Sequence, residues 1–177
     1  MIELRILYHG LGMAGKTTNL EKLKELYRDV VFDRFHQHTK EGRTVYLDML
    51  SLKLKTRLEN VDLIVSLFTT PGQERFALMR PWLFGHSSAV VFVFDSSRSV
   101  EENIRSFQEI RDHAGGLVVQ ANKRDVENAI ELEEVKRIFS DYTVVPAVAI
   151  EGIGVIETFR EALKVALNGA RKTSSTP

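Results

Sequence analysis

The chain alternates between short, continuously apolar runs and segments in which apolar residues recur every three or four positions. Continuous runs of this length predict buried strands, and the helical spacing predicts amphipathic helices. The runs cover residues 2–8, 88–95, 116–122 and 142–149, and the helical spacing covers residues 16–28, 100–110, 132–138 and 156–167. This alternation predicts an α/β domain in which a mostly parallel sheet of about six strands has helices on both faces.

The region after the first predicted helix follows a different pattern. Residues 29–43 show no clear period and are expected to form a long loop. Residues 44–68 predict two long strands that turn near Glu59–Asn60. Their apolar positions change phase between Met49 and Leu50, which predicts a β-bulge there. Pro146, in the last apolar run, predicts an edge strand because proline cannot donate to a sheet.

Composition fits one globular domain. Of 177 residues, 44% are hydrophobic and 27% are charged. Basic and acidic residues number 24 each, so the charge balance favours neither nucleic acid nor an anionic membrane as a partner. We expect residues 1–168 to form a single domain and residues 169–177 to form a disordered polar tail.

The sequence also argues against membrane attachment. The chain has no cysteine, which excludes disulfides, cysteine-ligated zinc and lipid anchors carried by cysteine. No apolar stretch is long enough to cross a bilayer, and no signal peptide precedes the first expected strand. The expected compartment is therefore the cytoplasm.

A phosphate-binding motif follows the first expected strand. The stretch "GLGMAGKT" (Gly10–Thr17) fits G-x-x-x-x-G-K-[ST] between a strand and a helix. Glycines let backbone N–H groups point at phosphate oxygens, and the helix N-terminus adds partial positive charge. We expect Lys16 at the β- and γ-phosphates, the Thr17 hydroxyl on Mg²⁺ and Thr18 near the α-phosphate. The remaining phosphate-loop residues expected at the nucleotide are Gly10, Gly12, Ala14 and Gly15.

A second motif indicates which base is bound. "NKRD" (Asn122–Asp125) ends the third apolar run and fits N-K-x-D. The Asp125 carboxylate can accept hydrogen bonds from N1–H and the N2 amine of guanine, whereas adenine offers neither donor there. Asn122 can bond N7 of the base and tie this segment to the phosphate loop, and the stem of Lys123 can lie along the base and ribose.

Together these motifs resemble those of the small Ras-like GTPases, over nearly the whole chain. The stretch from Phe76 to Trp82 is similar to the Arf branch, within a second switch at about residues 69–85. The segments "TTPG" (69–72), "GRTVYLDMLSL" (42–52), "ANKRD" (121–125) and "AIEGIGVIETF" (149–159) look most like the bacterial MglA-type GTPases. These are switches of cell polarity and motility.

The resemblance implies roles for residues in two switch segments. Gln73 matches the glutamine that orients the attacking water, and the Gly72 N–H would sense the γ-phosphate. Thr44, in a first switch at about residues 29–44, matches the threonine that closes on Mg²⁺. Arg43 matches an arginine finger supplied in cis, although an ordinary solvated arginine is an equal alternative on sequence alone.

Two positions depart from the family pattern. Thr69 replaces the aspartate of D-x-x-G, and a hydroxyl holds a metal-bound water without adding negative charge. Asp48 is a candidate to compensate, with a solvent-facing strand residue as the stronger alternative. Ala149 matches the backbone contact to guanine O6. Its usual neighbours, serine and lysine, are replaced by Val148 and Ile150, which leaves the backbone donors of Ala149 and Ile150.

The leading hypothesis is a GTP-binding switch that hydrolyses GTP slowly and needs an activating partner, which the resemblance implies to be of the roadblock, MglB-like type. The alternative is a guanine-nucleotide-bound interaction module with little or no hydrolysis. A nucleoside kinase lacks support because we find no arginine-rich lid.

His36 and His38 form an H-x-H pair, but no third metal ligand lies nearby, so solvated or packed histidines are favoured. His9 and His86 have no partner readable from sequence.

Overall fold

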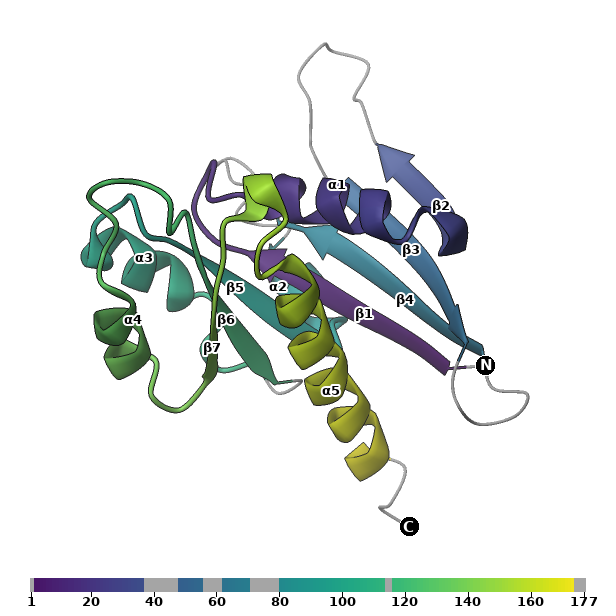
Figure 1. Ribbon diagram of the computed structural model, residues 1–177. Coiled ribbons are helices and arrows are strands. Elements are labelled where there is room, and N and C mark those ends of the chain that lie inside the picture. The colour runs from purple at the N-terminus through teal and green to yellow at the C-terminus, as the bar shows by residue number, and fades with distance from the viewer. Residues whose placement is uncertain (1, 37–47, 56–61, 71–79, 114–115, 174–177) are drawn as a thin grey trace, which may run out of the picture.

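A seven-stranded sheet forms the centre of the molecule, in the order β2-β3-β4-β1-β5-β6-β7 (Figure 1). The computed structural model describes residues 2–36, 48–55, 62–70, 80–113 and 116–173. The strands are β1 (Ile2–His9), β2 (Val31–His36), β3 (Asp48–Lys55), β4 (Asp62–Thr69), β5 (Ala89–Asp95), β6 (Leu117–Asn122) and β7 (Thr143–Pro146). Neighbouring pairs are parallel except that β3 is antiparallel to β2 and β4. The predicted α/β class is confirmed.

Helices cover both faces of the sheet. On one face, α1 (Lys16–Leu26) and α5 (Val155–Thr173) enclose a core that includes Leu23, Phe159 and Ile6. On the other face, α2 (Arg80–Gly85), α3 (Val100–Phe107) and α4 (Leu132–Ile138) pack over Phe92 and Phe139. Every residue of β5 and β6 is buried, which explains why their sequences are apolar runs rather than alternating patterns.

The segment predicted as a loop after α1 instead contains regular structure. A short 3-10 helix, η1 (Arg28–Val30), leads into β2, which pairs with β3. The register of this pair shifts between Val31 and Asp33. An irregularity of that kind breaks the alternation of apolar and polar residues, so periodicity could not reveal the strand. The rest of the predicted first switch, residues 37–44, lies outside the described residues.

The predicted bulge at Met49–Leu50 is wrong. The β3–β4 register is continuous from Met49 to Lys55, and the described irregularity lies in β2. Leu50 and Leu52 face the α1–α5 core, whereas Met49 lies on the opposite face and lines a cavity of about 350 Å³ with Phe68. The sheet has apolar surroundings on both faces here, so apolar residues in both phases need no bulge.

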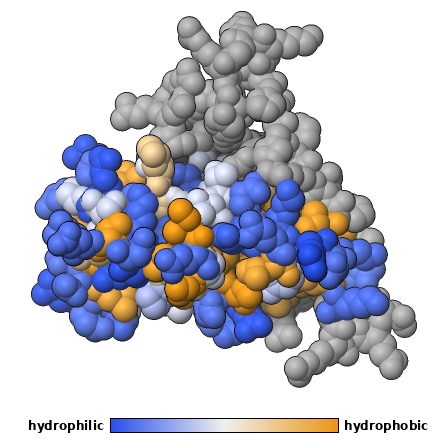
Figure 2. Space-filling view, turned by 45° about the horizontal axis from the view of Figure 1, so that its top comes forward, coloured by the Kyte–Doolittle hydropathy of each residue, from blue (hydrophilic) through white to orange (hydrophobic). Residues whose placement is uncertain are grey.

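Other boundaries agree with expectation to differing degrees. α1 ends at Leu26, near the expected Arg28, and β7 with Pro146 is an edge strand as predicted. α5 continues to Thr173, so residues 169–173 are helical rather than part of a disordered tail, and residues 174–177 lie outside the description. None of the described helices has the length and apolar character of a membrane span. On the face in Figure 2, hydrophobic residues form small patches among hydrophilic ones.

Candidate functional site

The candidate site lies at the carboxyl ends of the parallel strands β1, β5 and β6. β1 leads through Gly10–Gly15 into α1, and β6 ends at Asn122, whose backbone lies beside Asp95 at the end of β5. A third loop follows β7 and contains the short 3-10 helix η3 (Ala149–Glu151). In open α/β sheets this end of the strands is where ligands bind. The topology thus brings together motifs more than 100 residues apart in sequence.

The phosphate loop has a backbone that requires glycine at two points. Gly10 has φ 153° and Gly15 has φ 103°. A Cβ on Gly10 would lie 2.4 Å from the Val93 carbonyl oxygen, and one on Gly15 would lie 2.3 Å from Asn122 Nδ2. Met13 also has a positive φ, 64°, and its side chain is 92% exposed at the loop surface. Sterics therefore fix both the shape of the loop and its distance from β5 and β6.

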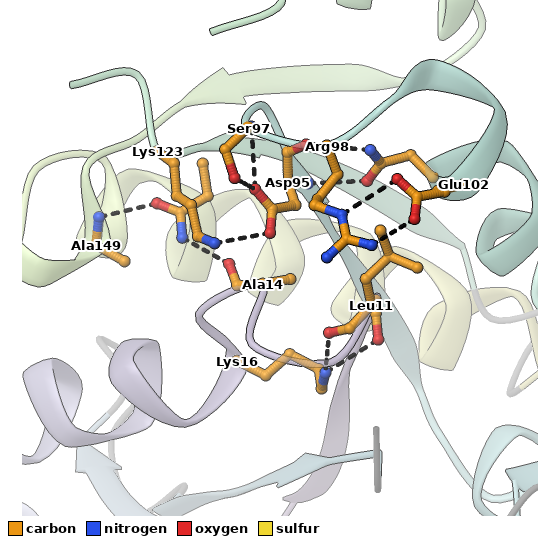
Figure 3. Close-up of polar contacts among 12 residues, drawn as sticks. Leu11, Ala14, Lys16, Asp95, Ser97, Arg98, Glu102, Lys123 and Ala149 are labelled. Atoms are coloured by element: carbon orange, nitrogen blue, oxygen red, sulfur yellow. Dashed lines mark hydrogen bonds and ion pairs between the residues drawn. The ribbon is translucent and has the colours of Figure 1, made fainter. Parts of the chain in front are cut away.

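Lys16 folds over the phosphate loop that precedes it. Its Nζ donates to the carbonyl oxygens of Gly10 at 2.9 Å and Leu11 at 2.6 Å, and the residue is 7% exposed (Figure 3). α1 begins at Lys16, and its N-cap residue Gly15 makes no side-chain cap hydrogen bond. Thr17 and Gly12 are exposed, and Thr18 is half-buried. This arrangement places cationic and backbone donors at one concave loop, as phosphate binding requires.

Asn122 holds the three loops of the site together. Its Nδ2 donates to the Ala14 carbonyl at 2.8 Å, and its Oδ1 accepts from the Ala149 N–H at 2.9 Å (Figure 3). The predicted tie from Asn122 to the phosphate loop is confirmed. The Ala149 N–H was expected to donate to guanine O6, and in the structure it donates to Asn122. Because Ala149 is buried, that N–H needs an acceptor, and the amide oxygen supplies one.

Lys123 has a partner that the sequence reasoning missed. Its Nζ lies 2.7 Å from Asp95 Oδ2, and the other oxygen of this carboxylate accepts from the N–H and the hydroxyl of Ser97 (Figure 3). Asn103 fixes the Asp95 backbone through two hydrogen bonds. The available signal was that Asp95 ends the apolar run next to the one that ends in "NKRD". Neighbouring parallel strands bring such ends together.

Two further charged residues, Arg98 and Glu102, follow Asp95 in the chain and form an ion pair with each other. Glu102 closes a capping box with Ser99 at the start of α3 and pairs with Arg98. The hydrogen bond from Arg98 is the main reason that the pKa of the Glu102 carboxyl falls to about 2. Glu102 is therefore ionised at neutral pH, and it accepts a hydrogen bond from Arg98 in the loop after β5.

The remaining predicted residues fall into two groups. Asp125 is exposed in the "NKRD" segment, and Ile150 is exposed in the loop after β7 (residues 147–154), which we call the base-side loop. Because the carboxylate of Asp125 is exposed, its discrimination against adenine applies only where a base covers it. Arg43, Thr44, Gly72 and Gln73 lie outside the described residues, as do His38 and the side chains of His36 and Asp48.

Thr69, at the position of the missing aspartate, ends β4 and is buried beside β1. Its register partner is Tyr8, one residue before His9 and two before the phosphate loop. Within the part of the chain that the structure describes, no group of three or more histidine, cysteine or acidic side chains could hold a metal ion. Hydroxyl, water and phosphate oxygens are among the hard ligands that Mg²⁺ prefers.

Comparison with known proteins decides the family. A sequence profile of the Ras family matches residues 9–168. The chain belongs to the Ras family. It is therefore a small GTPase, and it carries the phosphate-loop and "NKRD" motifs on which the resemblance rested.

Individual relatives match almost the full chain. The mutual gliding-motility protein MglA of Myxococcus xanthus is 30% identical over 97% of this chain and 94% of its own length. An uncharacterized protein of Methanocaldococcus jannaschii is 26% identical over 91% and 96%. The mouse ADP-ribosylation factor-like protein 14 is 24% identical over 98% and 90%. The expected resemblance to both MglA-type and Arf-type proteins is confirmed.

Proposed function

We propose that the protein is a switch that binds GTP, hydrolyses it slowly to GDP and signals through its two switch segments, at about residues 29–44 and 69–85. The observation that carries the proposal is the position of Asn122, whose amide contacts both the phosphate loop and the base-side loop. One nucleotide that reached from Lys16 to Asp125 would contact both of the loops that Asn122 connects. Guanine fits because Asp125 can accept from N1–H and the N2 amine.

The phosphate side of the site suits a magnesium nucleotide. Lys16 would neutralise charge at the β- and γ-phosphates, and the N–H groups of Gly10–Gly15 and of the first turn of α1 would bind the oxygens. The exposed hydroxyl of Thr17, joined by Thr44, would hold Mg²⁺, which supplies charge neutralisation during phosphoryl transfer. Hydroxyl oxygens are suitable ligands, so the described donors fit the ion.

Hydrolysis would depend on residues of the switch segments. Gln73 would orient the attacking water, the Gly72 N–H would report the γ-phosphate, and Arg43 would stabilise charge on the β–γ bridge. By analogy with its class, intrinsic turnover is on the order of 10⁻⁴ to 10⁻² s⁻¹. A switch this slow needs an activating protein. The 30% identity to MglA favours a partner of the roadblock, MglB-like type.

The cellular role we propose is control of cell polarity or motility in the cytoplasm. The name of the Myxococcus relative, a gliding-motility protein, supports that role. We propose no nucleic-acid partner, because basic and acidic residues balance at 24 each. We also propose no lipid anchor, because the chain lacks the cysteine that prenylation and palmitoylation need. Recruitment would then depend on protein partners.

The test begins with the nucleotide carried by the purified protein, released by heating in buffer with Mg²⁺ and separated by anion exchange. GDP or GTP near one per chain is expected, and ADP or ATP would contradict the guanine assignment. Single-turnover GTP hydrolysis then compares wild type with Gln73→Leu, with and without a roadblock-type partner. Loss of partner-stimulated hydrolysis in the variant is expected.

A guanine-nucleotide-bound interaction module with little hydrolysis is the second candidate. The observation that favours it is Thr69, buried at the end of β4 where the family pattern has a charged aspartate. Equal rates for wild type and Gln73→Leu in the presence of partner would support this candidate over the hydrolysing switch. If a partner still bound the GTP-bound protein more tightly than the GDP-bound protein, this would then show signalling without hydrolysis.

A further inference from the structure

A second connection between the phosphate loop and the base-side loop runs through the interior of the domain. It consists of Asn19 on α1, Gln120 on β6 and Thr158 on α5, and each of these residues is 0% exposed. We call this set the buried amide network. None of the three belongs to the phosphate-loop or "NKRD" motif, and no role was expected for them from the sequence.

The hydrogen bonds of the buried amide network allow one consistent assignment of donors and acceptors. The Thr158 hydroxyl donates to the Gly154 carbonyl at 2.7 Å, so its oxygen accepts from Gln120 Nε2 at 2.9 Å. Gln120 Nε2 also donates to Asn19 Oδ1, and Asn19 Nδ2 donates to Gln120 Oε1, each at 2.8 Å. The second Asn19 Nδ2 hydrogen goes to the Gly15 carbonyl at 2.9 Å. Carbonyls at both ends fix which way each amide faces.

Both ends of the network lie in loops of the nucleotide site. Gly15 is the last residue of the phosphate loop, and Gly154 closes the turn that follows η3. Gly154 has φ 74°, and a Cβ there would lie 2.2 Å from the Pro146 carbonyl oxygen, so this turn is fixed against the end of β7. A bridge between Val148 and Ile153 closes the same turn. A shift of Gly154 would therefore move the whole base-side loop.

The polar character of the network is unusual for its surroundings. The adjacent core on this face is formed by Leu20, Leu23 and Phe159. Leucine in place of both amides would give packing without the cost of desolvating four polar atoms. The amides instead contribute directional hydrogen bonds. A fully satisfied network of this kind holds α1, β6 and α5 in one relative arrangement.

We propose that Asn19, Gln120 and Thr158 are positioning residues for nucleotide binding, which hold the phosphate loop and the base-side loop at a fixed separation. Asn122, which is also buried, makes the same connection at the end of β6, and the buried amide network makes it two residues earlier in that strand. This inference rests on the proposed binding of a guanine nucleotide that contacts both loops. A preorganised site loses less freedom on binding, so loss of the network raises the dissociation constant although no contact with ligand is removed.

The test uses full-length variants and fluorescent GDP with Mg²⁺. Thr158→Val removes the hydroxyl and keeps the shape, whereas Thr158→Ser keeps the hydroxyl. Asn19→Leu/Gln120→Leu removes both amides together, so that neither is left buried without a partner. Ser51→Ala is the control, since Ser51 is also buried and hydrogen-bonded, to Ser66, but lies in β3. GDP dissociation rates and thermal unfolding of the nucleotide-free forms are measured for each.

We expect GDP to dissociate about tenfold faster from Thr158→Val and from the double variant, which corresponds to ~1.4 kcal/mol. Thr158→Ser and Ser51→Ala are expected to keep the wild-type rate, and the nucleotide-free double variant to unfold near the wild-type temperature. Wild-type dissociation rates in folded Thr158→Val or double variant would overturn the inference. Failure of the wild-type protein to bind GDP would instead contradict the proposed function.

Discussion

The ammonium of Lys123 lies 2.7 Å from the carboxylate of Asp95, which is 2% exposed, while the lysine side chain is 31% exposed. The lysine backbone has a left-handed φ of 62°. A non-glycine residue in that region is strained, and the ion pair with Asp95 anchors the end of its side chain. Asp95 therefore positions the side chain of Lys123, the second residue of the "NKRD" segment.

Asp95→Asn is expected to release GDP about tenfold faster than wild type. The amide would keep an oxygen for the N–H of Ser97 but would lose the charge that holds the Lys123 ammonium. A hydrogen bond between charged groups is worth about 1.5–3 kcal/mol, and exposure of the lysine reduces this. Stopped-flow chase of fluorescent GDP measures the rate. Asp62→Asn, which removes a more exposed carboxylate paired with Lys53 at 2.9 Å, is the control, and an equal effect of both changes would contradict the role of Asp95.

Gly15→Ala is expected to weaken nucleotide binding on the order of 100-fold. The new Cβ would lie 2.3 Å from Asn122 Nδ2 on a backbone with φ 103°, so both the loop and the Asn122–Ala14 hydrogen bond would be disturbed. Gly85→Ala is the matched control, because nothing lies within 4 Å of a Cβ there and alanine favours the α2 helix. Isothermal titration with GDP gives both constants. Tight GDP binding by Gly15→Ala would show that Asn122 does not constrain the loop.

His9 is expected to influence hydrolysis through Thr70, which precedes the central part of the second switch segment. Its Nε2 lies 3.0 Å from the Ser106 carbonyl, so in the neutral ring this nitrogen carries the proton, and Nδ1 accepts from the Thr70 hydroxyl at 3.0 Å. His9→Asn places an amide near Nδ1, and His9→Gln places one near Nε2.

We expect His9→Gln to lower single-turnover GTP hydrolysis roughly fivefold, the equivalent of one hydrogen bond of about 1 kcal/mol, and His9→Asn to lower it less. Thermal unfolding of both variants controls for lost packing against Phe84 and Phe92. Equal hydrolysis by the two variants would mean that the contact with Thr70 does not matter.

His113 is expected to make stability depend on pH. Burial lowers the pKa of this imidazole below its usual value near 6.5, and a hydrogen bond to the Ser87 backbone opposes the shift only in part. Because the folded pKa is depressed, the folded state binds fewer protons than the unfolded state at acidic pH. The stability present above about pH 6.5 is therefore lost as pH falls, which lowers the free energy of unfolding. His113→Asn should therefore unfold about 2 °C higher relative to wild type at pH 5 than at pH 7.5. Scanning calorimetry at both values tests this, and a difference independent of pH would rule it out.

Periodicity and motif spacing were sufficient for the order of most strands and helices and for the two nucleotide motifs. They failed at β2, because the irregular register at Val31–Asp33 hides its alternation. They also placed a bulge in β3, because apolar residues on both faces of a covered strand look like a change of phase. Local patterns carry information about which faces are apolar, and they do not report which neighbour supplies the apolar environment.

The parts of the site that the sequence could not reveal are contacts between distant segments. Asn19 and Gln120 are 101 residues apart, and Lys123 and Asp95 are 28 apart. Each of these side chains has an unremarkable local setting, and the pairs exist only because β1, β5 and β6 are neighbours. A polar residue inside an apolar run, such as Gln120 in "LVVQAN", was the one visible sign that a buried partner must exist.

The order β1-β5-β6 also acts as a ruler. β5 lies between the strand that carries the phosphate loop and the strand that carries "NKRD", so the ends of those two strands are two inter-strand steps of about 4.8 Å apart. Asn122 crosses this gap, because its amide donates to the Ala14 carbonyl in the phosphate loop at 2.8 Å. The width of β5 thus sets how far the Asn122 side chain and the phosphate loop must reach to join the two halves of the site.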